Sequence, residues 1–354
     1  MTKTLALTAL LTVIAAAGFS QKRFVQNAHI GVLYPISSNG AAAGEYTNRF
    51  SLHILSGVSR NERGLSVSGL VNVIKDSATG LQAAGISNRV GKAAQGLQLA
   101  GIINDCGSLS GLQVGGIFNR AGNGAGGAQV AGLINTAQET GLQMAGWFNR
   151  ATHSKLQIAG LVNKASGATV QVAGLVNIAE KVSGVQLAGL LNIADSSDYP
   201  IGLINLIKNG EKSVSLTTDE VFTTLLGFRS GGRVLYGIIG AGYNFKTGRR
   251  LYALEAGFGA HIPVTGRFRF NGEAAFQTLS DFHRGEYFSS TLRFLAAWRP
   301  VKAAELFAGP SFSHIQYTHD MGKGLRAHYT WNKTVHGRFF ALAPGLVAGV
   351  QVNF

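Results

Sequence analysis

Four histidines near the C-terminus are the first residues that could do chemistry. They are His314, His319, His328 and His336, and Asp320 adjoins the second of them. Imidazole nitrogens and carboxylate oxygens are common zinc ligands, and zinc sites usually place them at short, fixed spacings. No such spacing occurs here, so we expect solvated loop residues. The sequence predicts no metal site and no cofactor.

Acidic and basic side chains recur later in the chain at alternating positions of the expected strands. They are Glu255, Arg269, Glu273, Arg293 and Arg299. Such a set could act in catalysis, but charges inside a barrel are costly unless they are paired or hydrated. We therefore expect ion pairs that either fill the lumen or line a polar path through it.

Motifs that bring a catalytic or nucleotide-binding mechanism are missing. The run GIIGAGYNF, residues 237–245, contains GxG but lacks the third glycine and the following helix of a dinucleotide site. Walker, HExxH, GxSxG and CxxC motifs do not occur, and the lone Cys106 excludes an internal disulfide. The sequence predicts a protein that is not an enzyme.

A tandem repeat fills the middle of the chain and predicts the secondary structure there. Its phrase is GLQLAGIIN at residues 96–104, and related phrases recur every 13 to 16 residues. Each copy has an asparagine, a glycine three residues before it and, in most copies, a glutamine six residues before it. The asparagines are Asn72, Asn88, Asn104, Asn119, Asn135, Asn149, Asn163, Asn177, Asn192 and Asn205. The glycines run from Gly69 through Gly85 and Gly101 to Gly202, and the glutamines are Gln82, Gln98, Gln113, Gln129, Gln143, Gln157, Gln171 and Gln186. A fixed short period indicates a repeat architecture in which these shared residues mark the register.

Alternation within each phrase predicts a β-strand. Leu97, Leu99 and Ile103 would share one face, and Gln98 and Asn104 the other. Two architectures accept such strands. In an antiparallel outer-membrane β-barrel, the apolar face would meet lipid and the amides would line the interior. In a β-solenoid, each copy would be one coil, and the amides would stack as ladders of identical residues.

The first arrangement, with the repeat strands in the wall of one wide barrel, is our preferred prediction. Trp147 beside Phe148 favours strands that are apolar on both faces, and FSLHILSG at residues 50–57 reads as a further degenerate repeat. A central solenoid followed by a small C-terminal barrel is the alternative. Uniform units favour this alternative, because the strands of a barrel alternate in direction and in the length of their connections.

The last third of the chain has the strand alternation of a barrel wall. Its final strand carries aromatic or aliphatic side chains at every second position and ends on Phe354. A terminal phenylalanine of this kind resembles the assembly signal of Gram-negative outer-membrane barrels. We expect about seven strands between Val214 and Phe354. Because bacterial barrels have even strand numbers, HIGVLYPI at residues 29–36 is a candidate for the missing one.

The N-terminus predicts export from the cytoplasm. Residues 1–20 have a basic start, an apolar run and small residues before Gln21, as in a secretory signal peptide. The remaining chain has a formal charge of +13 but lacks the helices and motifs of nucleic-acid binding. We expect lipid or lipopolysaccharide phosphates and the barrel-assembly machinery as partners, and a polar solute or glycan is a further candidate; we do not expect nucleic acid.

The order of these segments resembles a family of surface-repeat envelope proteins of Gram-negative bacteria. The resemblance covers about residues 50–260 and depends on the repeated glutamine, glycine and asparagine positions. It implies a location in the cell outer membrane and says little about activity. The chain then divides into a signal peptide (1–20), N-terminal strands (21–60), tandem repeats (61–209) and barrel strands (210–354).

These predictions favour a non-enzymatic outer-membrane surface protein, either structural or a passive pore. An adhesion or binding module built on a solenoid is the alternative. A lipid hydrolase is a minor one, because Ser313 directly precedes His314 near the end of a late strand. Lipid A deacylases, however, have a histidine followed by serine and asparagine, whereas isoleucine and glutamine follow His314.

Overall fold

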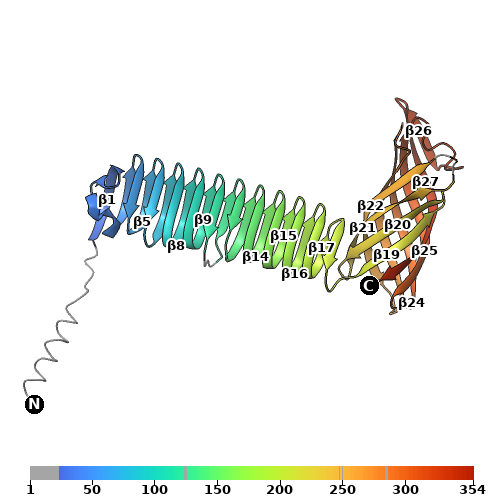
Figure 1. The fold of residues 1–354 in the computed structure, drawn as a ribbon, viewed down its shortest axis with the longest axis horizontal. Coiled ribbons are helices and arrows are strands. Elements are labelled where there is room, and N and C mark those ends of the chain that lie inside the picture. The colour runs from blue at the N-terminus through green and yellow to red at the C-terminus, as the bar shows by residue number, and fades with distance from the viewer. Residues whose placement is uncertain (1–23, 123–125, 247, 249, 284–285) are drawn as a thin grey trace, which may run out of the picture. The chain divides into compact units, whose positions relative to one another are not determined.

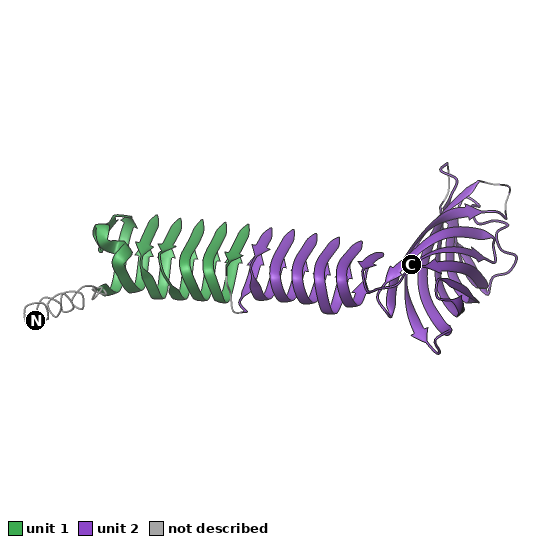
Figure 2. Ribbon diagram, turned by 60° about the horizontal axis from the view of Figure 1, so that its bottom comes forward, with its two compact units in different colours: residues 1–125 green, residues 126–354 purple. Residues whose placement is uncertain are grey.

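The computed structural model describes residues 24–122, 126–246, 248, 250–283 and 286–354, and these form an all-β protein. The predicted signal peptide lies outside the described residues. The chain divides into two compact units, residues 1–125 and 126–354 (Figure 2). Among the described residues, no helix is both long enough and apolar enough to cross a membrane.

The first unit is a stack of parallel strands. Residues at equivalent repeat positions lie opposite each other, as Asn88 does opposite Asn104. Between residues 24 and 122, the short pairing of β1 with β2 is the antiparallel exception. Its elements are β1 (Phe24–Leu33), β2 (Ile36–Ser37), the 3-10 helix η1 (Gly40–Glu45), β3 (Tyr46–His53), β4 (Ser56–Ser59), β5 (Asn61–Ser68), β6 (Val71–Ile74), β7 (Ala78–Ala84), β8 (Ser87–Ala100), β9 (Ile103–Gly115) and β10 (Phe118–Ala121).

The second unit begins with a stack of the same kind (Figure 1). Gln143 lies opposite Gln157, and Asn149 opposite Asn163, again in parallel strands. The strands are β11 (Ala128–Ala131), β12 (Ile134–Thr136), β13 (Glu139–Ala145), β14 (Phe148–Ala159), β15 (Val162–Ala173), β16 (Val176–Ala188), β17 (Leu191–Ile201) and β18 (Ile204–Ile207).

Parallel, in-register pairing means that the repeats are solenoid coils, so the alternative arrangement is the one found and the single wide barrel is wrong. The repeat phrase does not run through as one straight strand. β8 ends at Ala100 and β9 starts at Ile103, which makes a corner at Gly101 and Ile102. A Cβ atom on Gly101 would lie 2.1 Å from the carbonyl oxygen of Gly85 in the preceding coil. The repeated glycine therefore permits close stacking of coils at the corner.

The rest of the second unit is a closed antiparallel barrel of eight strands. They are β19 (Lys212–Asp219), β20 (Thr223–Gly231), β21 (Leu235–Asn244), β22 (Leu251–Pro263), β23 (Phe268–Ser280), β24 (Tyr287–Val301), β25 (Ala304–Thr318) and β27 (Arg338–Asn353). Pairing of β19 with β27 closes the ring, and β26 (Trp331–Val335) forms a hairpin with β27. The HIGVLYPI segment contributes no wall strand, because β1 pairs with β3 of the first unit.

Alternation along the barrel strands separates two environments. In β24, Tyr287, Ser289 and Thr291 are buried, whereas Phe288 and Leu292 point outward and are exposed. Inside one end, apolar side chains that include Leu251, Leu279 and Ile315 form a packed cluster. The outward residues form an apolar surface around the wall.

The last coil of the stack is hydrogen-bonded to the barrel within the second unit. The backbone N–H of Asn205 donates to Ser230 Oγ (2.9 Å), and its side-chain amide donates to the Ser230 carbonyl oxygen (3.1 Å). Ser230 belongs to β20. Strand β20 thus supplies the hydrogen-bond partners that Asn205 would otherwise find in a following coil.

Candidate functional site

The asparagine column forms a buried hydrogen-bonded ladder in each unit. The side-chain amide of Asn88 donates to Asn104 Oδ1 (2.9 Å) and also to the Leu99 carbonyl oxygen at the next corner (2.7 Å). Asn104 bonds in the same way to Asn119 (2.9 Å). Asn135 donates to Asn149 (3.0 Å) in the second unit. Each of these three donors, Asn88, Asn104 and Asn135, uses both amide hydrogens and so joins its coil to the next one.

The glutamine column runs in the opposite sense. Gln113 donates to Gln98 Oε1 (2.8 Å), and Gln143 donates to Gln129 Oε1 (2.8 Å), each toward the preceding coil. Gln143 also reaches across its own coil to the Arg150 carbonyl oxygen (3.0 Å). Glutamine and asparagine therefore brace the two strands of a coil as well as neighbouring coils.

The link between Gln82 and Gln98 and the position of Cys106 differ from this pattern. Gln82 is buried in the glutamine column, but its side-chain amide has no hydrogen-bond partner within the part of the chain that the structure describes. Cys106 is buried in place of an apolar residue and accepts a hydrogen bond from Gln113 (3.3 Å). Burial raises the pKa of the Cys106 thiol to about 12, so it stays protonated and unreactive at neutral pH.

The start of the stack contains a buried cluster of titratable residues. His29 and His53 face each other with their Nε2 atoms 3.5 Å apart. Glu62 accepts hydrogen bonds from Asn48 (3.1 Å) and Ser51 (2.8 Å) through Oε1. Burial lowers the pKa of His29 and lowers that of His53 to about 4, where the neighbouring His29 adds to the effect. Burial raises the pKa of Glu62, so the cluster favours neutral side chains.

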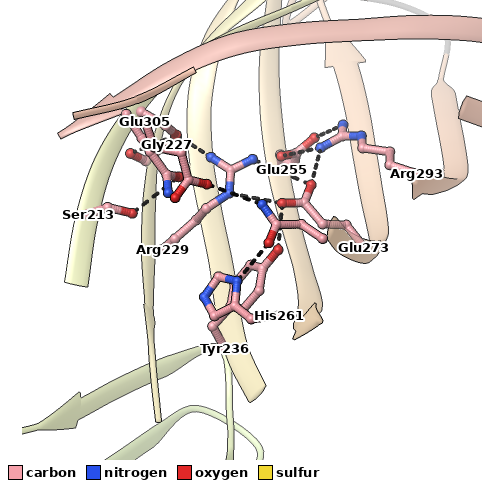
Figure 3. Close-up of polar contacts among 12 residues, drawn as sticks. Ser213, Gly227, Arg229, Tyr236, Glu255, His261, Glu273, Arg293 and Glu305 are labelled. Atoms are coloured by element: carbon pink, nitrogen blue, oxygen red, sulfur yellow. Dashed lines mark hydrogen bonds and ion pairs between the residues drawn. The ribbon is translucent and has the colours of Figure 1, made fainter. Parts of the chain in front are cut away.

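The barrel interior holds a network of buried ion pairs (Figure 3). Glu273 receives Arg229 Nε on Oε1 (3.0 Å) and Arg293 Nη1 on Oε2 (3.3 Å), and Tyr236 also donates to Oε1 (2.9 Å). Arg293 pairs in addition with Glu255. The four charged side chains are almost completely buried and their formal charges cancel.

A second set of ion pairs lies toward the end of the barrel where β19 starts. Arg269 bonds to Glu211 and Glu305 at 2.8 Å each. Arg299 bonds to Glu305 (2.6 Å) and to Glu211. This set is also neutral. All five charges identified from the sequence thus point inward and are paired. They fill the lumen, which is the first of the two arrangements expected from the sequence.

Sequence reasoning missed three charged members of these networks. Arg229 and Glu305 alternate with apolar residues in their strands, so the same parity rule that found Glu273 applies to them. Glu211 precedes β19, and no strand pattern covers it. Tyr236, which donates to Glu273, was also missed because a tyrosine in an apolar run reads as packing.

Residues considered for catalysis are not assembled into a site. Ser313 is buried and points into the barrel, while His314 points outward and stacks against Phe340. Adjacent strand residues face opposite sides, so the two cannot form a nucleophile–base pair. In the described part of the chain, no group of three or more histidine, cysteine, aspartate or glutamate side chains is arranged to hold a metal ion.

Two remaining surface features complete the candidate sites. The turns of the second-unit stack border a cavity of about 600 Å³ lined by residues that include Glu139, His153, Lys155 and Glu180. Phe354 follows the last barrel strand and is exposed, and its backbone N–H donates to the Lys212 carbonyl oxygen (2.9 Å).

Comparison with known proteins gives no match to a family model, to a curated protein or to a solved structure.

Proposed function

We propose that this protein is an outer-membrane barrel with a closed lumen, which anchors the repeat stack to the membrane. The supporting observation is the division of the barrel into two environments. Large apolar side chains such as Leu292 and Leu346 point outward and are 65% and 66% exposed. Such a surface is stable against lipid and costly against water. The paired charges occupy the opposite, inner side.

A filled interior argues for an anchor and against a passive pore. The interior of an eight-stranded barrel is just wide enough for side chains. Here Arg229, Glu273, Arg293 and Glu255 occupy it with mutual hydrogen bonds, and the apolar cluster around Leu279 packs one end. Opening a path would separate buried ion pairs, each of which is costly to break.

The connections between strands indicate which side of the membrane each end faces. At the end where β19 starts and β27 stops, the connections are residues 232–234, 264–267 and 302–303. At the other end, they include the longer segments 245–250, 281–286 and 319–330. Outer-membrane barrels have short periplasmic turns and longer extracellular loops. We infer that the repeat stack, which leads directly into β19, is periplasmic rather than displayed at the surface.

Conductance in planar bilayers tests the closed anchor. The reconstituted full chain should show no stable openings, whereas discrete long-lived steps would refute a closed lumen. A variant with Glu273→Ala and Arg293→Ala, both inside the barrel, is the matched comparison. If it inserts, it should leak more than the parent.

Labelling of single cysteines in whole cells tests the sidedness. A membrane-impermeant maleimide should modify Lys323→Cys in the long loop of intact cells. It should modify Thr169→Cys in a repeat turn only after the outer membrane has been permeabilised. Labelling of Thr169→Cys in intact cells would put the stack at the surface and contradict the proposal. The buried native Cys106 is replaced by alanine in both variants.

A further inference from the structure

The corners of the second-unit stack present a row of large apolar side chains to the outside. In each coil, the residue after the repeat glycine lies at the corner, and four of these residues form what we call the ridge: Trp147, Leu161, Leu175 and Leu190. Their exposed fractions lie between 41% and 56%. Tight turns are usually formed by Gly, Pro, Asn, Asp and Ser, so a row of large apolar side chains at the corners requires an explanation.

Both outer faces that meet at the ridge are apolar as well. Before the corner, the outward residues of successive coils are Leu142, Met144, Leu156, Ile158, Val170, Val172, Val185 and Leu187. After the corner they are Phe148, Val162, Val176 and Leu191. All of them are half-buried or exposed, because their alternating neighbours fill the coil interior. The opposite edge of the coils carries polar side chains, such as Glu139 at the start of β13, Lys155 in β14 and Glu180 in β16. The stack is therefore amphipathic in cross-section.

This apolar edge is larger than a water-soluble surface usually tolerates. The ridge together with Met144 and Leu187, which are 39% and 40% exposed, presents roughly 500 Å² of apolar surface before the half-buried columns are added. That is already the size of the largest patch on a typical monomer. The first unit repeats the feature at Leu70, Ile86 and Ile117, which are exposed in the same repeat position.

The shape of the edge favours a fluid covering. Its apolar surface continues around a convex corner onto two faces, so a flat protein partner or a second stack would cover one face and leave the other in water. Acyl chains adapt to both faces at once, as they do around the apolar side of an interfacial helix.

Basic side chains lie where lipid head groups would be. Arg150 and Lys164 are exposed and follow Phe148 and Val162 by two residues, so they share the same outward face one step further from the ridge. Two strand residues span about 7 Å. This is close to the depth that an interfacial apolar face enters a bilayer, and positive charge at that level attracts anionic lipids.

We propose that this apolar edge inserts into the surface of the same bilayer that holds the barrel, with Arg150 and Lys164 at the level of anionic head groups. The inference depends on the proposed membrane function, since the barrel must first fix the stack at the bilayer. The stack would then be a membrane-surface element, with its polar turns left in water.

Depth-dependent fluorescence quenching in vesicles tests this inference. The full mature chain, with Cys106→Ala, is reconstituted into phosphatidylethanolamine–phosphatidylglycerol vesicles and labelled with an environment-sensitive dye at one cysteine. Leu175→Cys reports the ridge, Thr169→Cys reports the polar edge of the same stack, and Phe294→Cys reports the barrel wall. We expect brominated acyl chains to quench the dye at position 175 at least threefold more than at position 169, and aqueous iodide to show the reverse.

The three positions separate the two proposals. If the dye at position 294 is quenched by brominated lipid while position 175 responds to iodide like position 169, the ridge inference is overturned and the membrane barrel stands. If position 294 also escapes lipid quenching, the barrel proposal fails. Disulfide cross-linking between copies at Leu175→Cys without lipid quenching would show that a second copy covers the ridge, and this too overturns the inference.

Discussion

The amide stack and the barrel interior solve the same problem, the burial of polar side chains, in different ways. In the stack, Asn149 bonds to Asn163 and Gln143 to Gln129, so identical neutral groups bond to each other across neighbouring coils. In the barrel, each charged side chain has a unique environment, and the charges of Arg229, Arg293, Glu273 and Glu255 cancel. A repeated neutral pair tolerates interruption of one link, whereas a charged network depends on every member.

Breaking the charged network should have the largest effect. Glu273→Gln removes the carboxylate that receives Arg229 and Arg293, and so leaves buried positive charge with less compensation. We expect a loss of about 3–5 kcal/mol in the free energy of unfolding. Urea unfolding of the full chain in detergent micelles measures it. Asp195→Asn, which removes a pair with the exposed Lys208, is the control and should cost at most about 1 kcal/mol. Equal losses of unfolding free energy in Glu273→Gln and Asp195→Asn would mean that burial does not increase the contribution of the barrel ion pairs to stability.

Interrupting an amide ladder should have an intermediate effect. Asn163→Ala leaves Asn177 Oδ1 and the Val172 carbonyl oxygen without the amide that donates to them. The expected cost is about 1–3 kcal/mol, because each buried group loses its partner but no charge is stranded. Hydrogen exchange of the β15 and β16 amides should report faster local opening. Ser166→Ala, which removes an exposed bond to Glu180, should leave the exchange unchanged. If Asn163→Ala lost as much unfolding free energy as Glu273→Gln, the neutral stack and the charged barrel interior would not differ in their sensitivity to the loss of one residue.

Changing pH should have the smallest effect and should act at the start of the stack. The lowered pKa values of His29 and His53 mean that below pH 6.5 the unfolded chain takes up protons that the folded chain takes up only at lower pH, which for His53 is about pH 4. Stability should therefore fall as pH decreases through this window. Glu62 opposes this trend, since its raised pKa lets the folded form gain a proton first. In Glu62→Gln, the β3 amides should exchange faster at pH 5 than at pH 7 after correction for intrinsic rates.

The histidine pair supplies the control for this pH dependence. Adding His29→Asn and His53→Asn to Glu62→Gln should remove the difference between the two pH values. The central coils around Asn163 contain neutral amides in their interior, so their corrected exchange should not change with pH in either variant. A pH response there of the same size as in β3 would contradict the assignment to the histidines.

Much of the fold follows from local patterns. The repeat spacing predicted equivalent units with a shared register, and the parity of residues such as Glu255 and Arg293 predicted inward charges, because strand side chains alternate whatever their partners are. The pairing of the charges did not follow from sequence. Arg269 meets Glu211 across 58 positions of the chain, and only closure of the barrel brings such residues together.

The sequence by itself determined that the protein is all-β, that Asn104 and its equivalents hold one register, and that the last third alternates between polar and apolar faces. The tertiary structure alone decided that the repeat strands run parallel. A period of two is the same in parallel and antiparallel sheets. The direction is decided at the corners of the coils, such as the one between β8 and β9, where the chain turns and the next coil stacks on the preceding one with Gly101 against the Gly85 carbonyl oxygen.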